Sequence, residues 1–485
     1  MKLRHCIYIY ALAYFAFLYL PHCARVVDND VWWHLKTGQL IAQTHHVPTT
    51  DPFTFTAHGQ PWVAQEWLSE VIFHSFYAMR GYQGVLILDS VLLFLILAGI
   101  GELVRRRLKP TPLVFMVATL CALGTQPFWA PRPQLFTYLC LTVLLLLLDR
   151  PQEKALWLTI PLFCLWSNLH GVWLVGFAVL ALTLADYIGL AILQKRPEDA
   201  IRFVTIGLLS LAAVLIGPNP VSRLLYPIVH SVSALGTVNV AEFNSPDFHM
   251  SDFFPFLITL ALLPIATYLG RKQMRLSTWV LMIGGMSMAL LNMRNVPLFS
   301  IILAPILALQ ISSACERFEE KNGLINWTGM PEKVMLNWLT LPLLIACIII
   351  SFPKSRNEDD YDTNGFFPAR ACRYLITQPT IGRGRLLNNY NWGGYLIFKL
   401  WPKYMTSMDG RGDVHHLHLE EDAKKLERLA SPDWRKQLAK RDPDVILWPA
   451  NKPLVVMLDK DPDWKSVYRD SMAVIYVRTA PSVNH

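Results

Sequence analysis

Long apolar runs alternate with short polar segments through the first three quarters of the chain. Most runs approach the length of about 20 apolar residues that a helix needs to cross a bilayer. The pattern predicts about eleven transmembrane helices, over 5–24, 83–104, 111–128, 133–148, 155–169, 171–193, 202–217, 253–270, 276–292, 296–311 and 335–352. The runs 133–148 and 155–169 are short for a full crossing. Helices there would be tilted or broken, which leaves the count open by one or two.

The pattern changes after residue 352, where short β-prone runs alternate with helix-like segments. Strands are predicted at 386–388, 444–448 and 473–477, and helices at 420–430 and 431–440. We therefore expect two domains. Residues 1–352 would form a transmembrane domain with long loops at 25–82 and 218–252. Residues 353–485 would form a soluble α/β domain.

Composition supports the membrane interpretation. Of the 485 residues, 53% are hydrophobic and only 16% are charged, against roughly a quarter charged in soluble domains. The net charge of +8 does not indicate a nucleic-acid partner, because the basic residues lie in short clusters between apolar runs. Eight cysteines show no spacing that would build a disulfide framework or a zinc site.

The basic residues also predict the orientation of the chain. Clusters such as 105–109, 195–202 and 271–275 fall on one side of the predicted helices, and few basic residues fall on the other. Cytoplasmic loops are rich in Lys and Arg. The N-terminus would then be cytoplasmic, and 353–485 would lie outside the cytoplasm of a multi-pass protein of the plasma (inner) membrane. The first run also fits a cleaved signal peptide, which remains an alternative.

Candidate chemistry begins directly after the first apolar run, at Asp28-Asn29-Asp30. Two carboxylates one residue apart at a membrane boundary can hold a cation or supply a general base. The alternative is a helix cap, because an amphipathic stretch over 31–42 starts here. His34 lies within this stretch.

Other polar groups are expected on the same membrane face. Arg132, His170 and Arg294 stand at the outer ends of apolar runs, where donors of this kind can bind phosphate or simply pack at helix ends. Glu66 or Glu70 in the first long loop and Glu242 in the second are candidates for a further acid, with plain solvation as the alternative. An Asp- and His-rich stretch at 408–418 could bind metal, although its spacing fixes no geometry.

Several motifs in chain order resemble the GT-C superfamily of polytopic glycosyltransferases, through a bacterial branch of large membrane proteins. The matching motifs are Asp28-Asn29-Asp30 with Trp32-Trp33-His34-Leu35, Thr50-Asp51-Pro52-Phe53, Glu66-Trp67-Leu68, Arg132-Pro133-Gln134, Asn168-Leu169-His170-Gly171, Arg294-Asn295-Val296-Pro297, and Asn391-Trp392-Gly393-Gly394 with Asp409-Gly410-Arg411. They extend over nearly the whole chain.

The resemblance implies a function. GT-C enzymes take a sugar from a polyprenyl-phosphate carrier outside the cytoplasm and transfer it to a glycan, lipid or protein acceptor. Asp30 or Asp28 would be the general base, with Glu66 or Glu242 as a further acid and with inversion at the sugar. Arg132, His170, Arg294 and His34 would bind the substrate or its phosphate. Some members need a divalent metal such as Mg or Mn and others need none, and the sequence does not decide between them.

Two other function classes remain open at this stage. One is a transporter or flippase of a lipid-linked glycan. Transporters often show internal repeats and mid-membrane broken helices, and the sequence shows no internal repeat. The other is a non-catalytic membrane scaffold whose outer domain binds a partner.

Overall fold

The computed structural model describes residues 28–108, 111–149, 153–234, 241–322, 366–412, 414 and 434–479. The chain divides into two compact units. Unit 1 comprises Met1–Val26 and Leu86–Pro353, and unit 2 comprises Val27–Val85 and Lys354–His485. The first long loop thus belongs to the same unit as the C-terminal residues. The predicted helices at 5–24, 335–352 and 420–430 lie outside the described residues.

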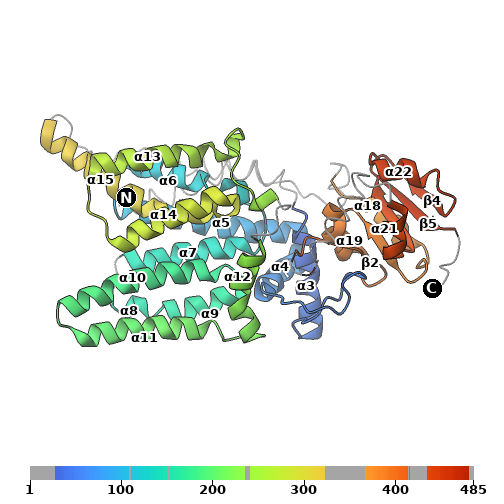
Figure 1. The fold of residues 1–485 in the computed structure, drawn as a ribbon, viewed down its shortest axis with the longest axis horizontal. Coiled ribbons are helices and arrows are strands. Elements are labelled where there is room, and N and C mark those ends of the chain that lie inside the picture. Colours follow the sequence, from blue (N-terminus) through green and yellow to red (C-terminus); the bar gives the residue numbers. More distant parts are fainter. Residues whose placement is uncertain are drawn as a thin grey trace. The chain divides into compact units, whose positions relative to one another are not determined.

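Unit 1 is a bundle of helices, several of which lie side by side in Figure 1. Every predicted span that the described residues cover contains a helix. The helices are α5 (Tyr82–Arg105), which begins in unit 2, α6 (Thr111–Leu123), α7 (Gln134–Asp149), α8 (Glu153–Leu156), α9 (Thr159–Leu169), α10 (Trp173–Leu193), α11 (Pro197–Ala213), α12 (Pro220–Ala234), α13 (Phe254–Gly270), α14 (Leu276–Leu291) and α15 (Val296–Asn322).

Not all of these helices are long enough to cross a bilayer. Among the described residues, four spans have sufficient length and apolar character: Tyr82–Arg105, Trp173–Leu193, Ser251–Gly270 and Met293–Glu320. A 16-residue helix such as α7 is about 24 Å long, short of the roughly 30 Å hydrocarbon layer. The expected count of about eleven crossings is therefore not confirmed. Exposed apolar residues such as Leu208, Ile258 and Ile283 fit a surface that faces lipid.

Unit 2 combines two early helices with a small sheet. The helices are α3 (Val31–Thr44) and α4 (Trp67–Arg80). The strands β1 (Arg385–Asn388), β2 (Met405–Thr406), β3 (Val445–Pro449), β4 (Trp464–Arg469) and β5 (Ala473–Arg478) run in the order β2-β1-β3-β5-β4. The helices α18 (Ala369–Thr377), α19 (Gly393–Leu400), α21 (Trp434–Arg441) and α22 (Pro453–Leu458) complete the α/β fold.

The sheet is mixed. Strand β1 is parallel to β2 and β3, and β5 is antiparallel to β3 and β4. The three predicted strands correspond to β1, β3 and β5. The other two were missed because β2 has only two residues and β4 is a largely exposed edge strand whose sequence has no continuous apolar run.

The loop after α3 extends the sheet region of unit 2. Thr54 forms a bridge with Thr406 of β2, and the backbone N–H of Phe55 donates to the Thr406 carbonyl at 3.0 Å. The indole of Trp401 donates to the Pro52 carbonyl at 2.9 Å. These bonds join the 50–56 segment to residues that follow it by more than 300 positions, which explains why unit 2 is discontinuous in sequence.

A buried ion triad holds the same region together. The Arg411 guanidinium lies 2.8 Å from Asp51 and 2.7 Å from Asp409, and all three side chains are fully buried. Its planar face also lies 4.6 Å from the centre of the Trp62 ring. Asp51 in turn accepts from the backbone N–H groups of Phe53 and Thr54, both at 3.1 Å. One cation therefore compensates two carboxylates and fixes the turn that carries the Thr54 bridge.

We expect Arg411→Met to destabilise unit 2 by about 3–5 kcal/mol, because two buried carboxylates would lose their cation. Hydrogen exchange of peptides covering 385–412, measured on the full chain, should accelerate by roughly 10²-fold or more. The matched control is Arg469→Met, because Arg469 pairs with Asp459 and the two side chains are 46% and 40% exposed. An exposed pair contributes about 0–1 kcal/mol. Equal effects of the two substitutions would contradict the role of the triad.

Candidate functional site

The two aspartates at the start of α3 have different environments. Asp28 is buried, and its Oδ1 accepts from the backbone N–H groups of Asp30 at 2.8 Å and Val31 at 3.1 Å. Asp28 therefore caps the first turn of α3, which is the structural alternative noted above. Asp30 makes no capping bond with its side chain and is only half buried. Of the two carboxylates, that of Asp30 is the more accessible.

Asp30 lies against the turn that carries the ion triad. Its Oδ1 accepts from the indole of Trp33 at 3.3 Å. A Cβ added at Gly410 would lie 1.9 Å from this oxygen, so a larger residue there would force the carboxylate to move. Gly394 packs against the Asn29 carbonyl in the same way, at 2.5 Å from a built Cβ. The glycines of the C-terminal motifs thus allow that part of the chain to approach the start of α3.

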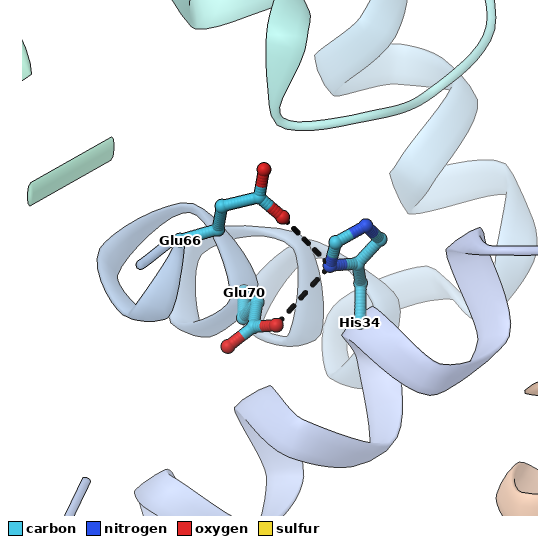
Figure 2. A group of neighbouring side chains, drawn as sticks. All are labelled: His34, Glu66 and Glu70. Atoms are coloured by element: carbon cyan, nitrogen blue, oxygen red, sulfur yellow. Dashed lines mark hydrogen bonds and ion pairs between the residues drawn. The ribbon is translucent and has the colours of Figure 1, made fainter. Parts of the chain in front are cut away.

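One helical turn beyond Asp30, His34 meets two glutamates (Figure 2). Its Nδ1 lies 3.1 Å from Oε1 of Glu70 and 3.6 Å from Oε2 of Glu66. Glu66 precedes α4 and Glu70 lies in its first turn, and the i, i+4 spacing puts both carboxylates on one face. Helices α3 and α4 approach closely because Gly38 has no side chain: a built Cβ would lie 2.0 Å from the Glu70 carbonyl oxygen.

The electrostatics of this cluster are coupled. Burial raises the pKa of Glu70 to about 7, and the charge of Glu66 acts in the same direction, while His34 opposes it. Burial alone would lower the pKa of His34, but Glu70, Glu66 and Asp30 together raise it. The cluster therefore favours positive charge at its centre. One ligand atom from each of His34, Glu66 and Glu70 lies within 4.8 Å of the others, so these residues could hold a metal ion.

A second group of predicted residues meets in unit 1. Arg132 pairs with Glu242 at 2.8 Å. The Arg294 guanidinium lies 5.7 Å from the ring centre of Phe243, and the backbone N–H of Met293 donates to the Asn244 carbonyl at 2.8 Å. The 241–244 segment is therefore attached both to the turn before α7 and to the joint between α14 and α15.

Two arginines act on one carboxylate in this group. Burial would raise the pKa of Glu242, but the charges of Arg132 and Arg294 bring it below its ordinary value. Glu242 is thus ionised at neutral pH, and among these three described residues two cations act on one anion. Such an arrangement attracts phosphate and makes Glu242 a weak base.

His170 lies in a buried hydrogen-bond network of unit 1. Its Nδ1 lies 2.8 Å from the Thr137 hydroxyl, which also accepts from the Trp166 indole at 2.9 Å. Nearby, the side chain of Asn168 bonds to Arg223, a buried arginine that donates to the Val214 carbonyl at 3.0 Å. These bonds join α9 to α7 and to α12, and they join α12 to the end of α11.

The structure groups the predicted residues differently from the sequence analysis. His34 was grouped with the phosphate-binding residues, whereas it lies with two carboxylates. Glu70 was named only as an alternative to Glu66, although the four-residue spacing of the two glutamates indicates that both lie on one face of a helix. Asp51 and Arg411 were noticed only as parts of motifs. In the 408–418 stretch, Asp409 binds Arg411, while Asp413 and the histidines lie outside the described residues.

No described protein family matches the sequence, and no curated protein is similar to it. Solved structures are similar. A crystal structure of the Archaeoglobus fulgidus oligosaccharyltransferase, tethered with an acceptor peptide containing the NVT sequon, has 12% identity and a TM-score of 0.53, covering 99% of this chain and 74% of that chain. The apo form of the enzyme has 11% identity and a TM-score of 0.55, covering 92% and 69%.

A third structure is the archaeal oligosaccharyltransferase AglB of the same organism in complex with an inhibitory peptide and a dolichol-phosphate. It has 11% identity and a TM-score of 0.52, and the match covers 99% of this chain and 74% of that chain. At such identity the likeness concerns the fold. The chain therefore has a fold similar to that of this archaeal oligosaccharyltransferase, with a bundle of apolar helices and a C-terminal α/β part.

Proposed function

We propose that the protein is a membrane glycosyltransferase of GT-C type. It would transfer a sugar from a polyprenyl-phosphate carrier to a glycan, lipid or protein acceptor outside the cytoplasm. The observation that carries the proposal is the likeness of nearly the whole chain to an oligosaccharyltransferase whose structures hold an acceptor peptide and a dolichol-phosphate. The half-buried Asp30 at the start of α3 supplies an acid of the kind that the reaction requires.

In the proposed reaction, Asp30 takes the proton of the acceptor hydroxyl or amide as that atom attacks the anomeric carbon. The new bond to the sugar forms while the bond between the anomeric carbon and the phosphate oxygen breaks. The polyprenyl phosphate leaves with the electron pair, and direct displacement inverts the anomeric centre. The transition state has oxocarbenium character, so a nearby carboxylate also stabilises it.

The leaving phosphate gains negative charge, and positioned cations stabilise such charge. We assign this role to Arg132 and Arg294. Glu242 would then hold the Arg132 guanidinium in place through their 2.8 Å pair rather than act as a base. His170 would support this region through its bond to Thr137.

The first prediction separates the two aspartates. Asp30→Asn should lower the release of polyprenyl phosphate by about 10²- to 10⁴-fold, the usual contribution of a general base. Asp28→Asn is the matched control, because Asn caps a helix about as well as Asp. It should keep activity within about tenfold of wild type and leave membrane abundance unchanged. The assay would use a panel of polyprenyl-phosphate sugars with the lipid-embedded protein. Normal turnover by Asp30→Asn would refute the assignment of the base.

The second prediction concerns the arginines. Arg132→Gln and Arg294→Gln should each lower kcat by roughly 10²-fold, because each removes positive charge that would stabilise the leaving phosphate. Arg271→Gln serves as the control, since Arg271 is an exposed residue at the end of α13. The same loss in the control would show that general basicity, rather than this group, supports turnover.

The third prediction tests the orientation. A periplasm-dependent reporter such as alkaline phosphatase, fused after His485, should be active, whereas a reporter fused after Arg107 should be inactive. The physical reason is the clustering of Lys and Arg on the cytoplasmic side. The reverse pattern would place Asp30 in the cytoplasm and would exclude the proposed use of an external acceptor.

A further inference from the structure

The cluster of His34, Glu66 and Glu70 in unit 2 has the composition and spacing of a metal site. Two carboxylate oxygens from one helical face and one imidazole nitrogen from the facing helix converge on a small volume (Figure 2). The Nδ1 atom of His34 lies 3.1 Å from the Glu70 oxygen and 3.6 Å from the Glu66 oxygen. Metal–nitrogen and metal–oxygen bonds of about 2.0–2.2 Å put neighbouring ligand atoms about 3–3.5 Å apart. The two separations from His34 are therefore close to those of ligands around one ion, and all three ligand atoms lie within 4.8 Å of one another.

A second observation points to a ligand here. The Glu70 side chain is 1% exposed and points toward His34, yet its Oε2 has no hydrogen-bond partner among the described residues. A buried carboxylate oxygen without a partner is costly. A cation held by both oxygens of Glu70 would remove that cost.

The charge balance supports the same conclusion. Two ionised glutamates and a neutral imidazole carry two negative charges, which one divalent cation cancels. Without the ion, the two carboxylates face one imidazole, and the charge of Arg411 also acts on Glu70. Gly38 lets α3 and α4 approach closely, and Asp28 caps the first turn of α3. The backbone therefore holds the ligands in place. Pre-arranged ligands of this kind favour binding.

The ligand types indicate the class of ion. Mg²⁺ prefers oxygen ligands and retains most of its water, whereas Zn²⁺ and Mn²⁺ accept an imidazole together with carboxylates. We propose that His34, Glu66 and Glu70 bind one divalent transition-metal ion, Zn²⁺ more tightly than Mn²⁺ and both more tightly than Mg²⁺. Glu66 is 21% exposed, so water could reach the cluster from the side of Glu66. This proposal stands independently of the glycosyltransferase proposal.

The experiment uses the full chain, without an affinity tag, in lipid nanodiscs. The protein is stripped with a chelator, dialysed against Zn²⁺, and its metal content is measured by mass spectrometry. Competition with a chromophoric chelator gives the affinity. The wild-type protein should retain one more Zn²⁺ ion per chain than either the Glu70→Gln or the Glu66→Gln variant. Replacing a residue that only hydrogen-bonds to a metal ligand weakens binding by roughly 10- to 100-fold. Each of these substitutions removes a ligand itself and should weaken Zn²⁺ binding by more than that.

Two controls locate the ion. Glu198→Gln removes an exposed carboxylate at the start of α11 and should bind Zn²⁺ as wild type does. Asp30→Asn should also retain the ion. If Glu70→Gln fails to fold, Glu66→Gln decides the matter, because the partly exposed Glu66 tolerates an amide. In the Mn²⁺-loaded protein, pulsed EPR should show ¹⁴N coupling that His34→Gln abolishes.

Three results would overturn the proposal. The first is wild-type protein that binds no ion below millimolar concentration. The second is binding that Glu66→Gln and His34→Gln leave unchanged. The third is binding lost in Asp30→Asn but retained in His34→Gln, which would locate the ion at the start of α3. None of these readouts requires turnover.

Discussion

The guanidinium of Arg411 compensates two carboxylates that water does not reach, and the geometry around Asp30 depends on this contact. Asp409, one of its partners, precedes Gly410, the residue against which the Asp30 carboxylate lies. Asp51, the other partner, fixes the turn that pairs with β2. Removing one member of a buried ion set leaves uncompensated charge at a cost of several kcal/mol. The start of α3 is therefore positioned by electrostatics from segments far away in the sequence.

Close backbone approach is the second constraint on unit 2. Gly38 brings α3 against α4, and Gly410 and Gly394 bring the C-terminal turns against the start of α3. In each case a Cβ would lie within 2.5 Å of an oxygen, a distance that real side chains do not adopt. The same three approaches that pack the unit also bring Asp30, His34 and the two glutamates into one region. Stability and chemistry therefore depend on the same glycines.

Much of this architecture could be predicted from local patterns, and the rest could not for physical reasons. Apolar runs predicted the helices of unit 1, and β-prone runs predicted β1, β3 and β5. Length of the apolar run is a local property, whereas the contact of Asp51 with Arg411 is not. Nothing near Asp51 or Arg411 in the sequence indicates its partner. Likewise, the i, i+4 spacing of Glu66 and Glu70 was visible, but the direction of His34 toward them depends on how α3 packs on α4.

The environments of the carboxylates separate their roles. Glu242 is held ionised by Arg132 and Arg294, which makes it a poor proton acceptor. Glu70 has a pKa of about 7, the most favourable value for a base at neutral pH, but it is fully buried and bonded to His34. An acceptor substrate cannot transfer its proton to a buried carboxylate that it cannot reach. A metal ion inside the cluster, in contrast, can use a buried carboxylate as a ligand. Asp30 and Glu66 are both partly exposed, but Glu66 faces His34 in the cluster proposed to hold a metal ion. Accessibility therefore outweighs proton affinity and favours Asp30 as the base, with Glu70 and His34 beside it as ligands.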